Sequence, residues 1–252
     1  MNVREQERSV WHEVECGTYA ADLPLWRRLA REAAREGTCD LLELGCGTGR
    51  VSLALAGGGL NVSAIDVDPE LVTVLRRRAA ERDAPVEAAV ADARSFELGR
   101  HFDLVLAPMQ LVQLLVGERE RLAMLRCVAA HLRPGAQVAL ALLALEDEWS
   151  SAPEQAPLPD MREVDGWVYA SRPVAVRRVR SGAAIELDRI RQTISPRGAV
   201  EETLSRVRLE IVTPERLEQE GRRAGLVPQP CRHVRPTADH VGSCVVILKA
   251  HA

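Results

Sequence analysis

Apolar and polar residues along the first 145 positions fall into blocks that switch between two periods. Nearly continuous apolar runs, typical of strands buried on both faces, are separated by segments whose apolar residues recur every three or four positions, as on an amphipathic helix. The predicted strands cover residues 39–44, 61–66, 85–92, 102–108 and 135–145. The predicted helices cover residues 22–36, 50–58, 69–82 and 117–132.

This alternation predicts a mostly parallel sheet with helices on both faces. Right-handed crossovers then favour a doubly wound α/β sandwich. Asp22 stands at the start of the first helix, where its side chain can cap the free backbone N–H groups. Asp68 has the same relation to the helix at 69–82, and Pro69 occupies that helix's first turn.

The pattern changes after residue 145. Residues 146–160, EDEWSSAPEQAPLPD, are acidic and rich in proline, which predicts a loop. Residues 167–180, 184–194 and 200–212 then alternate as strands, separated by the turn sequences RSGA and SPRG, so antiparallel hairpins are expected. A helix at 213–225, capped by Thr213, and strands at 226–234 and 243–250 complete the chain.

Length and composition exclude several classes of protein. The 252 residues fit one large domain or one domain with an elaboration, and the net charge of -3 gives no general attraction to nucleic acid or to an anionic membrane. The N-terminus lacks an apolar core and the longest apolar run, 138–145, is too short to span a bilayer, so we expect a cytoplasmic protein. The six cysteines form no CxxC pair, which predicts reduced thiols rather than zinc ligands or disulfides.

A glycine-rich loop, LLELGCGTGR at 41–50, follows the first strand. A dinucleotide-binding loop needs G-x-G-x-x-G, but Arg50 takes the third glycine position and the spacing of Gly45, Gly47 and Gly49 is G-x-G-x-G. Glu43 stands two residues before the loop and would repel a pyrophosphate. An acid there suits a ligand with an ammonium group and a positive sulfur.

Two further carboxylates end neighbouring strands. Asp66 closes the second strand, about 20 residues after the loop, where a carboxylate can accept both ribose hydroxyls. Asp92 closes the third strand, where a carboxylate can accept from an adenine amino group. The loop and both acids therefore belong to the carboxyl edge of one sheet.

The segments ELGCGTG, AIDVDPELV, VADARSF, FDLVLAP and LRPGAQVALAL, in this order and spacing, resemble the class I S-adenosylmethionine-dependent methyltransferases. The resemblance covers roughly residues 20–145 and the last helix and two strands. It implies a seven-stranded sheet whose last strand is antiparallel, with S-adenosyl-L-methionine as the cofactor and S-adenosyl-L-homocysteine as its product. The implied cofactor-binding residues are Glu43, Gly45, Cys46, Gly47 and Gly49 for the methionine part, Asp66 for ribose, Val67, Asp92 and Ala93 for adenine, and Ala107 and Pro108 beside the methyl group.

The inserted antiparallel strands resemble, more loosely, the small-molecule subgroup that methylates glycine, sarcosine or amino-sugars. This layout implies an N-terminal helical cap at 1–38 and an α/β cofactor-binding domain at 39–145 and 213–252. It also implies an acidic loop plus strand insert at 146–212 that covers the acceptor.

Other candidate residues have two interpretations each. The glycines could form only a tight turn, and Asp92 could cap a short helix at 93–96. Gln110 and Gln113 could orient an acceptor or lie in an exposed turn. His233 and His240 flank the hairpin between the last two strands and are candidate general bases, with surface imidazoles as the simpler interpretation. Tyr19 could line the acceptor site, or pack in the core as we expect of Trp26.

The expected reaction is in-line displacement of a methyl group onto N or O of a small molecule, which requires alignment more than a catalytic triad. The fourth strand ends in Ala107-Pro108, unlike nucleic-acid amino methylases or metal-dependent catechol enzymes, so no metal is expected. Seven arginines between 172 and 197 against Glu186 and Asp188 give a local excess of +5, usually a solvated face. An RNA or protein methyltransferase using these arginines, a non-catalytic cofactor-binding protein and a homodimer stay open.

Overall fold

The computed structural model describes residues 7–34, 36–143, 158–180, 182–237 and 240–252. The chain divides into two compact units. The α/β unit comprises residues 20–144 and 212–252, and the insert unit comprises residues 1–19 and 145–211. The predicted loop at 146–160 lies mostly outside the described residues.

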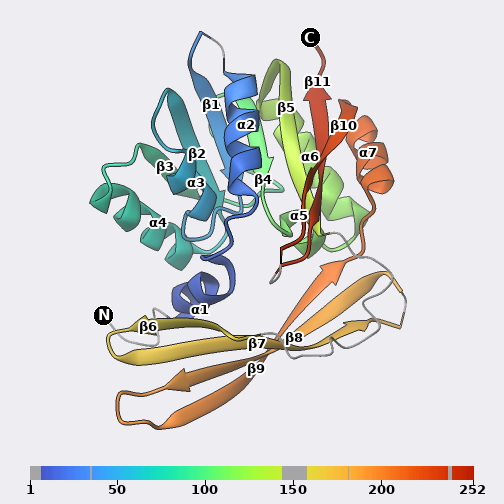
Figure 1. Cartoon of the computed structure of the whole chain (residues 1–252). Helices are drawn as coiled ribbons and strands as arrows, with labels where there is room; N and C mark the ends of the chain where they lie inside the picture. Colours follow the sequence, from blue (N-terminus) through green and yellow to red (C-terminus); the bar gives the residue numbers. More distant parts are fainter. Residues whose placement is uncertain (1–6, 35, 144–157, 181, 238–239) are drawn as a thin grey trace. The chain divides into compact units, whose positions relative to one another are not determined.

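The α/β unit contains a seven-stranded sheet in the order β10-β11-β5-β4-β1-β2-β3 (Figure 1). β11 is antiparallel to both of its neighbours, and the remaining strands run parallel to one another. The strand order changes direction between β1 and β4, and in doubly wound sheets ligands bind at the carboxyl ends of the strands at such a point. The strands are β1 (Cys39–Leu44), β2 (Leu60–Asp66), β3 (Val86–Val90), β4 (Phe102–Ala107), β5 (Leu132–Leu143), β10 (Leu226–Val234) and β11 (Ser243–Ala250).

Helices cover both faces of this sheet because its central strands are apolar on both sides. Leu41 and Leu42 are adjacent in β1, so they face opposite sides and join different apolar clusters. Trp26 and Leu29 of α2 pack in the cluster of Leu41 and are fully buried. The helices are α2 (Leu23–Ala33), α3 (Arg50–Leu55), α4 (Pro69–Glu81), α5 (Leu111–Leu114), α6 (Gly117–His131) and α7 (Pro214–Arg223).

The insert unit is a four-stranded antiparallel sheet in the order β6-β7-β8-β9, with helix α1 (Glu7–Cys16) packed on it. Trp11 of α1 meets Tyr169 edge to face, with ring centroids 5.3 Å apart, and Arg191 stacks over the Trp11 ring. The predicted antiparallel hairpins are therefore confirmed. The strands are β6 (Asp160–Val164), β7 (Trp167–Arg178), β8 (Ala184–Ile194) and β9 (Val200–Glu210).

The sequence did not predict β6, although a signal was present. Asp165 and Gly166, both with positive φ, join β6 to β7 as a two-residue turn. Asp-Gly between alternating strands is a strong hairpin signal. The stretch assigned to a loop therefore ends at Asp160, where β6 begins.

Arginines of the insert unit are neutralised by carboxylates of the same unit. Glu15 of α1 accepts two hydrogen bonds of 2.8 Å from Arg191. Burial alone would raise the pKa of Glu15, but bonds from Arg191 and Ser171 outweigh it and lower that pKa. Asp188 accepts from Arg206 and Arg177, which lower its pKa to about 2 despite the opposing effect of desolvation. Several of the insert arginines thus form ion pairs within the unit and stabilise its structure.

Candidate cofactor-binding site

The glycine-rich loop connects β1 to α3 at the carboxyl edge of the sheet. Gly45, Gly47 and Gly49 have φ values of +64°, +54° and +93°, a region that residues with a Cβ rarely adopt. Gly49 also lies so close to α4 that a Cβ would approach Leu75 Cδ1 to 2.2 Å. The loop therefore needs glycine for its conformation and, at Gly49, for close packing as well.

Asp66 ties this loop to the end of β2. Its carboxylate accepts from the backbone N–H of Gly47 at 2.8 Å and from that of Asp68 at 2.9 Å. Each oxygen accepts one of these bonds, so each keeps a lone pair for a further donor. Asp68 caps α4 by accepting from the N–H of Glu70, which confirms the predicted cap. Binding of ribose by Asp66 stays a prediction. Val67, between them, is 69% exposed, unusual for an apolar side chain at a sheet edge.

Asp92 lies after β3 and is held by a residue that the sequence did not identify. Arg94 donates to both oxygens of the Asp92 carboxylate through Nε and Nη2, at 2.6 to 3.1 Å, and to Glu120 at 2.9 Å. The Arg94 guanidinium lowers the pKa of Asp92. Residues 93–95 form a turn rather than the alternative short helix. Among the described residues, the backbone N–H of Ala93 donates to no other backbone group, which leaves a donor beside the Asp92 acceptor.

Glu43 lies beneath the loop rather than on its surface. Its side chain is 2% exposed, and one carboxylate oxygen accepts from the hydroxyl of Ser52. Burial raises the pKa of Glu43 to about 8, although the Ser52 hydrogen bonds and the Arg50 charge act in the opposite direction. Glu43, the acid predicted to attract a positively charged ligand, is therefore a buried carboxyl group that burial favours in its protonated form.

The predicted capping role of the Asp22 side chain is wrong. Asp22 stands at the start of α2, but its carboxylate makes no bond to the helix N–H groups. It accepts instead from Arg50 at 2.6 and 2.8 Å and from Trp26 Nε1 at 2.8 Å. Arg50, the residue that breaks the dinucleotide pattern, thus anchors the start of α3 to α2 through a buried ion pair.

β4 ends at Ala107, which is buried, and is followed by buried Pro108 and by Met109 with a φ of +55°. Positive φ is strained for a residue with a side chain and is often found at functional sites. Gln113 fits neither predicted role, because it is fully buried and its Oε1 accepts from the N–H of Leu143 at 2.7 Å. Gln110 precedes α5 and is half-buried, with no side-chain cap.

The remaining candidates are placed as follows. β10 is parallel to β5, so the hairpin between β10 and β11 lies at the carboxyl edge of the sheet, as predicted. His233 in β10 is exposed, whereas His240 donates its backbone N–H to Thr237 within that hairpin. Tyr19 belongs to the insert unit and is 8% exposed. Catalytic or acceptor-positioning roles for Tyr19, Gln110, His233 and His240 stay predictions.

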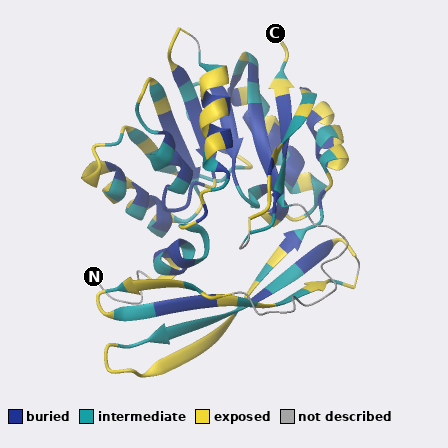
Figure 2. Cartoon of the chain, in the orientation of Figure 1, coloured by how far each residue is buried: buried dark blue, intermediate teal, exposed yellow. Residues whose placement is uncertain are grey.

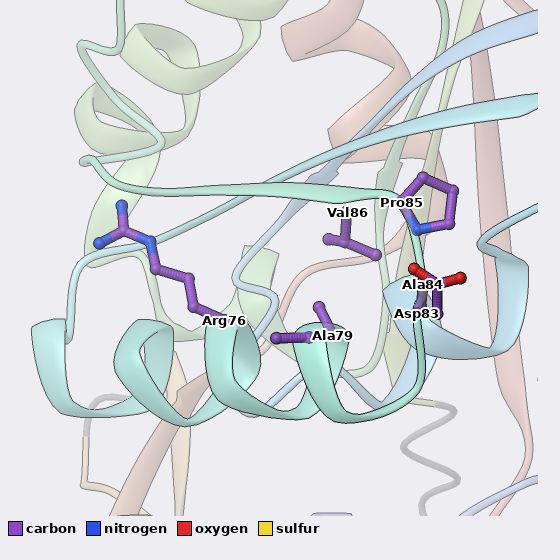
Figure 3. A pocket seen from close by; sticks show the side chains of 7 residues that line it. Arg76, Ala79, Asp83, Ala84, Pro85 and Val86 are labelled. Atoms are coloured by element: carbon purple, nitrogen blue, oxygen red, sulfur yellow. The ribbon is translucent and has the colours of Figure 1, made fainter.

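A surface hollow of about 320 Å³ lies away from these groups (Figure 3). It lies between Arg76 and Ala79 of α4 and the start of β3 at Pro85 and Val86, which is the amino end of that strand. Arg76, the cation beside it, donates to the carbonyl of Ala88. Its walls bring together no set of reactive groups, so the carboxyl edge is the candidate site.

Comparisons with known proteins agree with this location. The family model described as "Methyltransferase domain" matches residues 41–135, the part that contains the loop, Asp66 and Asp92. Cypemycin N-terminal methyltransferase from Streptomyces sp is 38% identical over 95 residues, 38% of either chain. The chain thus spans well under two thirds of the length of that relative.

Two solved structures share the fold across nearly the whole chain. The sugar N-methyltransferase KedS8 from Streptoalloteichus sp ATCC 53650 has a TM-score of 0.71 at 20% identity, covering 97% of this chain and 93% of that one. CalS10, an amino pentose methyltransferase from Micromonospora echinaspora, has a TM-score of 0.69 at 20% identity, covering 98% of both chains. The predicted fold class and the resemblance to methyltransferases are confirmed. Among the described residues, no helix is long and apolar enough to cross a membrane.

Proposed function

We propose that this chain, whose residues 41–135 match the model of a methyltransferase domain, is an S-adenosylmethionine-dependent methyltransferase that acts on a small molecule. One observation supports this most. The Asp66 carboxylate binds only backbone N–H groups, of the glycine loop and of the turn before α4, and keeps an acceptor on each oxygen. A diol such as the ribose of the cofactor supplies two matching donors.

The neighbouring groups fit the remaining parts of this cofactor. The Asp92 carboxylate and the Ala93 N–H present an acceptor and a donor, which match the amino group and ring nitrogen of adenine. Val67 offers an exposed apolar surface for the base. The glycine loop lets the methionine part lie against the backbone, above the buried Glu43.

When bound, the cofactor supplies an electrophilic methyl group on a positive sulfur. The residues of this chain bind and orient it. The hydrogen bond from Gly47 to Asp66 and the Asp22–Arg50 pair tie the loop and the start of α3 to their neighbours. Such positioning would contribute alignment, worth up to about 7–11 kcal/mol in favourable cases. Ala107 and Pro108, buried and apolar, place no competing nucleophile at the end of β4.

We infer that the acceptor is an amine of a small molecule, such as an amino-sugar or a peptide N-terminus. The named activities of CalS10, KedS8 and the cypemycin enzyme support this choice. The insert at 146–212 is our proposed acceptor cover. Nucleic acid is disfavoured because Glu15, Asp188 and Asp160 neutralise several insert arginines. A cytoplasmic location and a homodimer are further parts of the proposal.

A methyl-transfer assay tests it. Purified protein is incubated with S-adenosylmethionine and a panel of amino-sugars, amino-terminal peptides and phenols, and S-adenosylhomocysteine is measured. We expect turnover with at least one amine, and much slower turnover by the Asp66→Ala variant at a cofactor concentration that saturates the wild type. Steeply salt-dependent RNA binding would instead support the nucleic-acid alternative. Cofactor binding without turnover on a wide panel would support the non-catalytic one.

A further inference from the structure

The connection between β3 and β4, residues 91–101, carries the proposed adenine-binding pair near its start. It begins with a turn, in which Ser95 donates its backbone N–H to the carbonyl of Asp92. Residues 96–101, all within the described part of the chain, form neither strand nor helix. Because this segment lacks a regular ladder of backbone hydrogen bonds, its contacts with neighbouring elements decide where Asp92 and Ala93 lie.

Glu120, near the start of α6, holds Arg94 of this connection. Its Oε1 accepts from Arg94 Nη1 at 2.9 Å, and its Oε2 accepts from the backbone N–H of Val116 at 2.9 Å. Both carboxylate oxygens therefore have partners. Arg94 also donates through Nε and Nη2 to Asp92. A chain of hydrogen bonds thus runs from α6 to the acid that is proposed to accept from adenine.

Cys127, two turns further along α6, holds Phe96 of the connection. Its thiol donates to the carbonyl of Phe96 at 3.1 Å. The Phe96 ring is buried in the apolar cluster that contains Met124 and Val128 of α6. Figure 2 shows the buried colour along β4 and β5, two of the strands that contribute side chains to this cluster. Both the backbone and the side chain of Phe96 therefore attach the connection to α6.

His131, at the end of α6, holds Leu98. Its Nδ1 lies 2.8 Å from the carbonyl oxygen of Cys127, and because a carbonyl only accepts, Nδ1 carries the hydrogen. In the neutral ring Nε2 is then an acceptor, and the backbone N–H of Leu98 donates to it at 3.4 Å. Glu97 Oε1 lies 3.4 Å from the same nitrogen and would accept only from the protonated ring. The buried imidazole also packs on Phe96, with ring centroids 4.5 Å apart.

The three α6 residues lie on one face of the helix, because seven and four residues separate them along the chain. Their partners are alternate residues of the connection. We propose that this face, comprising Glu120, Cys127 and His131, positions Asp92 and Ala93 for recognition of adenine. The three are positioning residues, since each acts through the connection. The inference rests on the proposed function, in which Asp92 accepts from the adenine amino group and the Ala93 N–H donates to its ring nitrogen.

Placement of this pair should determine which base is accepted. Adenine presents an amino group to Asp92 and an unprotonated ring nitrogen to Ala93. Hypoxanthine presents a carbonyl oxygen and a ring N–H at the same two positions, so acceptor would face acceptor and donor would face donor. S-Inosylhomocysteine, which carries hypoxanthine, therefore probes the pair while it keeps the ribose and homocysteine parts of S-adenosylhomocysteine.

Calorimetric titration of the whole chain with both compounds tests the positioning. We expect the wild type to prefer S-adenosylhomocysteine by at least about 10-fold. His131→Phe keeps a ring against Phe96 but removes the acceptor for Leu98, so this preference should fall at least about 3-fold. His131→Gln supplies a side-chain oxygen in place of Nε2 and should restore the preference. An unchanged preference in His131→Phe would overturn the proposal.

A control separates positioning from a general loss of stability. Leu217→Ala removes a buried side chain of α7 from the same apolar cluster, and leucine has no polar atom that could hold the connection. This variant should unfold at a lower temperature and keep the preference between the two compounds. An equal fall in preference for Leu217→Ala and His131→Phe would contradict the positioning role. Cys127→Ala, with Cys127→Ser as its conservative partner, repeats the comparison at Phe96 if His131→Phe does not fold.

Hydrogen exchange, followed by mass spectrometry, tests the same role in the ligand-free chain. Relative to the rest of the α/β unit, exchange of residues 92–98 should rise at least about 3-fold in His131→Phe but not in His131→Gln or Leu217→Ala. Equal exchange in the wild type and His131→Phe would overturn the hold of α6 on the connection. Faster exchange in His131→Phe, with no binding of S-adenosylhomocysteine by the wild type, would support that hold and overturn the proposed function instead.

Discussion

Carboxylates in the two units have opposite surroundings. In the insert unit, Asp188 and Glu15 are each held by arginines, and their charges are satisfied within the unit. At the carboxyl edge of the α/β unit, Asp66 bonds only to backbone N–H groups and Glu43 to Ser52. The comparison separates carboxylates that stabilise structure from those that keep capacity for a ligand. Asp92 combines both kinds of surroundings, because its carboxylate pairs with Arg94 and also lies next to the backbone N–H of Ala93.

The largest expected difference between the two units is the loss of folding free energy when a glycine is replaced by alanine. Gly49→Ala meets Leu75 and a left-handed φ, so we expect a loss of at least about 3 kcal/mol of folding free energy, combining conformational strain and overpacking. Gly198→Ala, in the β8–β9 turn, has the same φ sign but no neighbour within 4 Å, and should lose about 1–2 kcal/mol. Urea unfolding measures both, and equal losses would contradict the close approach at Gly49.

Removal of Asp66 should affect the cofactor more than the fold. Asp66→Ala deletes the acceptor for ribose and the link to Gly47, so we expect S-adenosylhomocysteine affinity to fall about 100-fold, or about 2.7 kcal/mol. Asp68→Ala, two residues away, removes the cap of α4 and should cost about 1 kcal/mol of stability with little change in affinity. Calorimetry and thermal unfolding separate these effects. Similar affinity losses for both variants would exclude a specific role of Asp66.

Glu43 should make stability fall as pH rises. Its pKa is raised from 4.5 to about 8 in the folded chain, so the folded state retains a proton that the unfolded state loses. Between these pH values the slope should approach about 1.4 kcal/mol per pH unit for one proton. Glu43→Gln should remove this slope, as measured by urea unfolding across the range. An unchanged slope in the variant would show that Glu43 is ionised when folded.

Asp188 should show the opposite dependence. Arg206 and Arg177 lower its pKa from 3.8 to about 2, so its contribution to stability is present above the unfolded value and is lost as pH falls through this window. Asp188→Asn should therefore be less stable than the wild type at neutral pH and approach it near pH 2. The same unfolding series tests this, and a constant difference down to that pH would contradict the ion-pair account.

The smallest effect is expected at Arg94. Arg94→Met releases the Asp92 carboxylate, and because the pair is partly exposed, S-adenosylhomocysteine affinity should fall only about 2- to 5-fold. Arg119→Met, at an exposed arginine of α6, is the control. Tighter binding by Arg94→Met would indicate that Arg94 competes with adenine for Asp92.

Sequence patterns predicted the features of the fold that depend on residues close together in the chain. The five parallel strands, the glycine loop and the Asp68 cap each rest on contacts within one strand-loop-helix segment. Contacts between distant residues were not predictable. Asp22 pairs with Arg50, 28 residues away, and Gln113 with Leu143, 30 residues away, so both were given roles suited to isolated segments. The packing of helix α1 on the insert sheet was also not predictable, because Trp11 contacts Tyr169, which is far away in the sequence.

The carboxyl edge of the sheet should bind S-adenosylmethionine and its product S-adenosylhomocysteine rather than a dinucleotide. Calorimetric titration of the wild-type chain with S-adenosylhomocysteine and, in parallel, with NAD distinguishes the two. We predict saturable binding of S-adenosylhomocysteine with one site per chain and no heat of binding for NAD. Binding of NAD without S-adenosylhomocysteine, or of neither, would contradict the account.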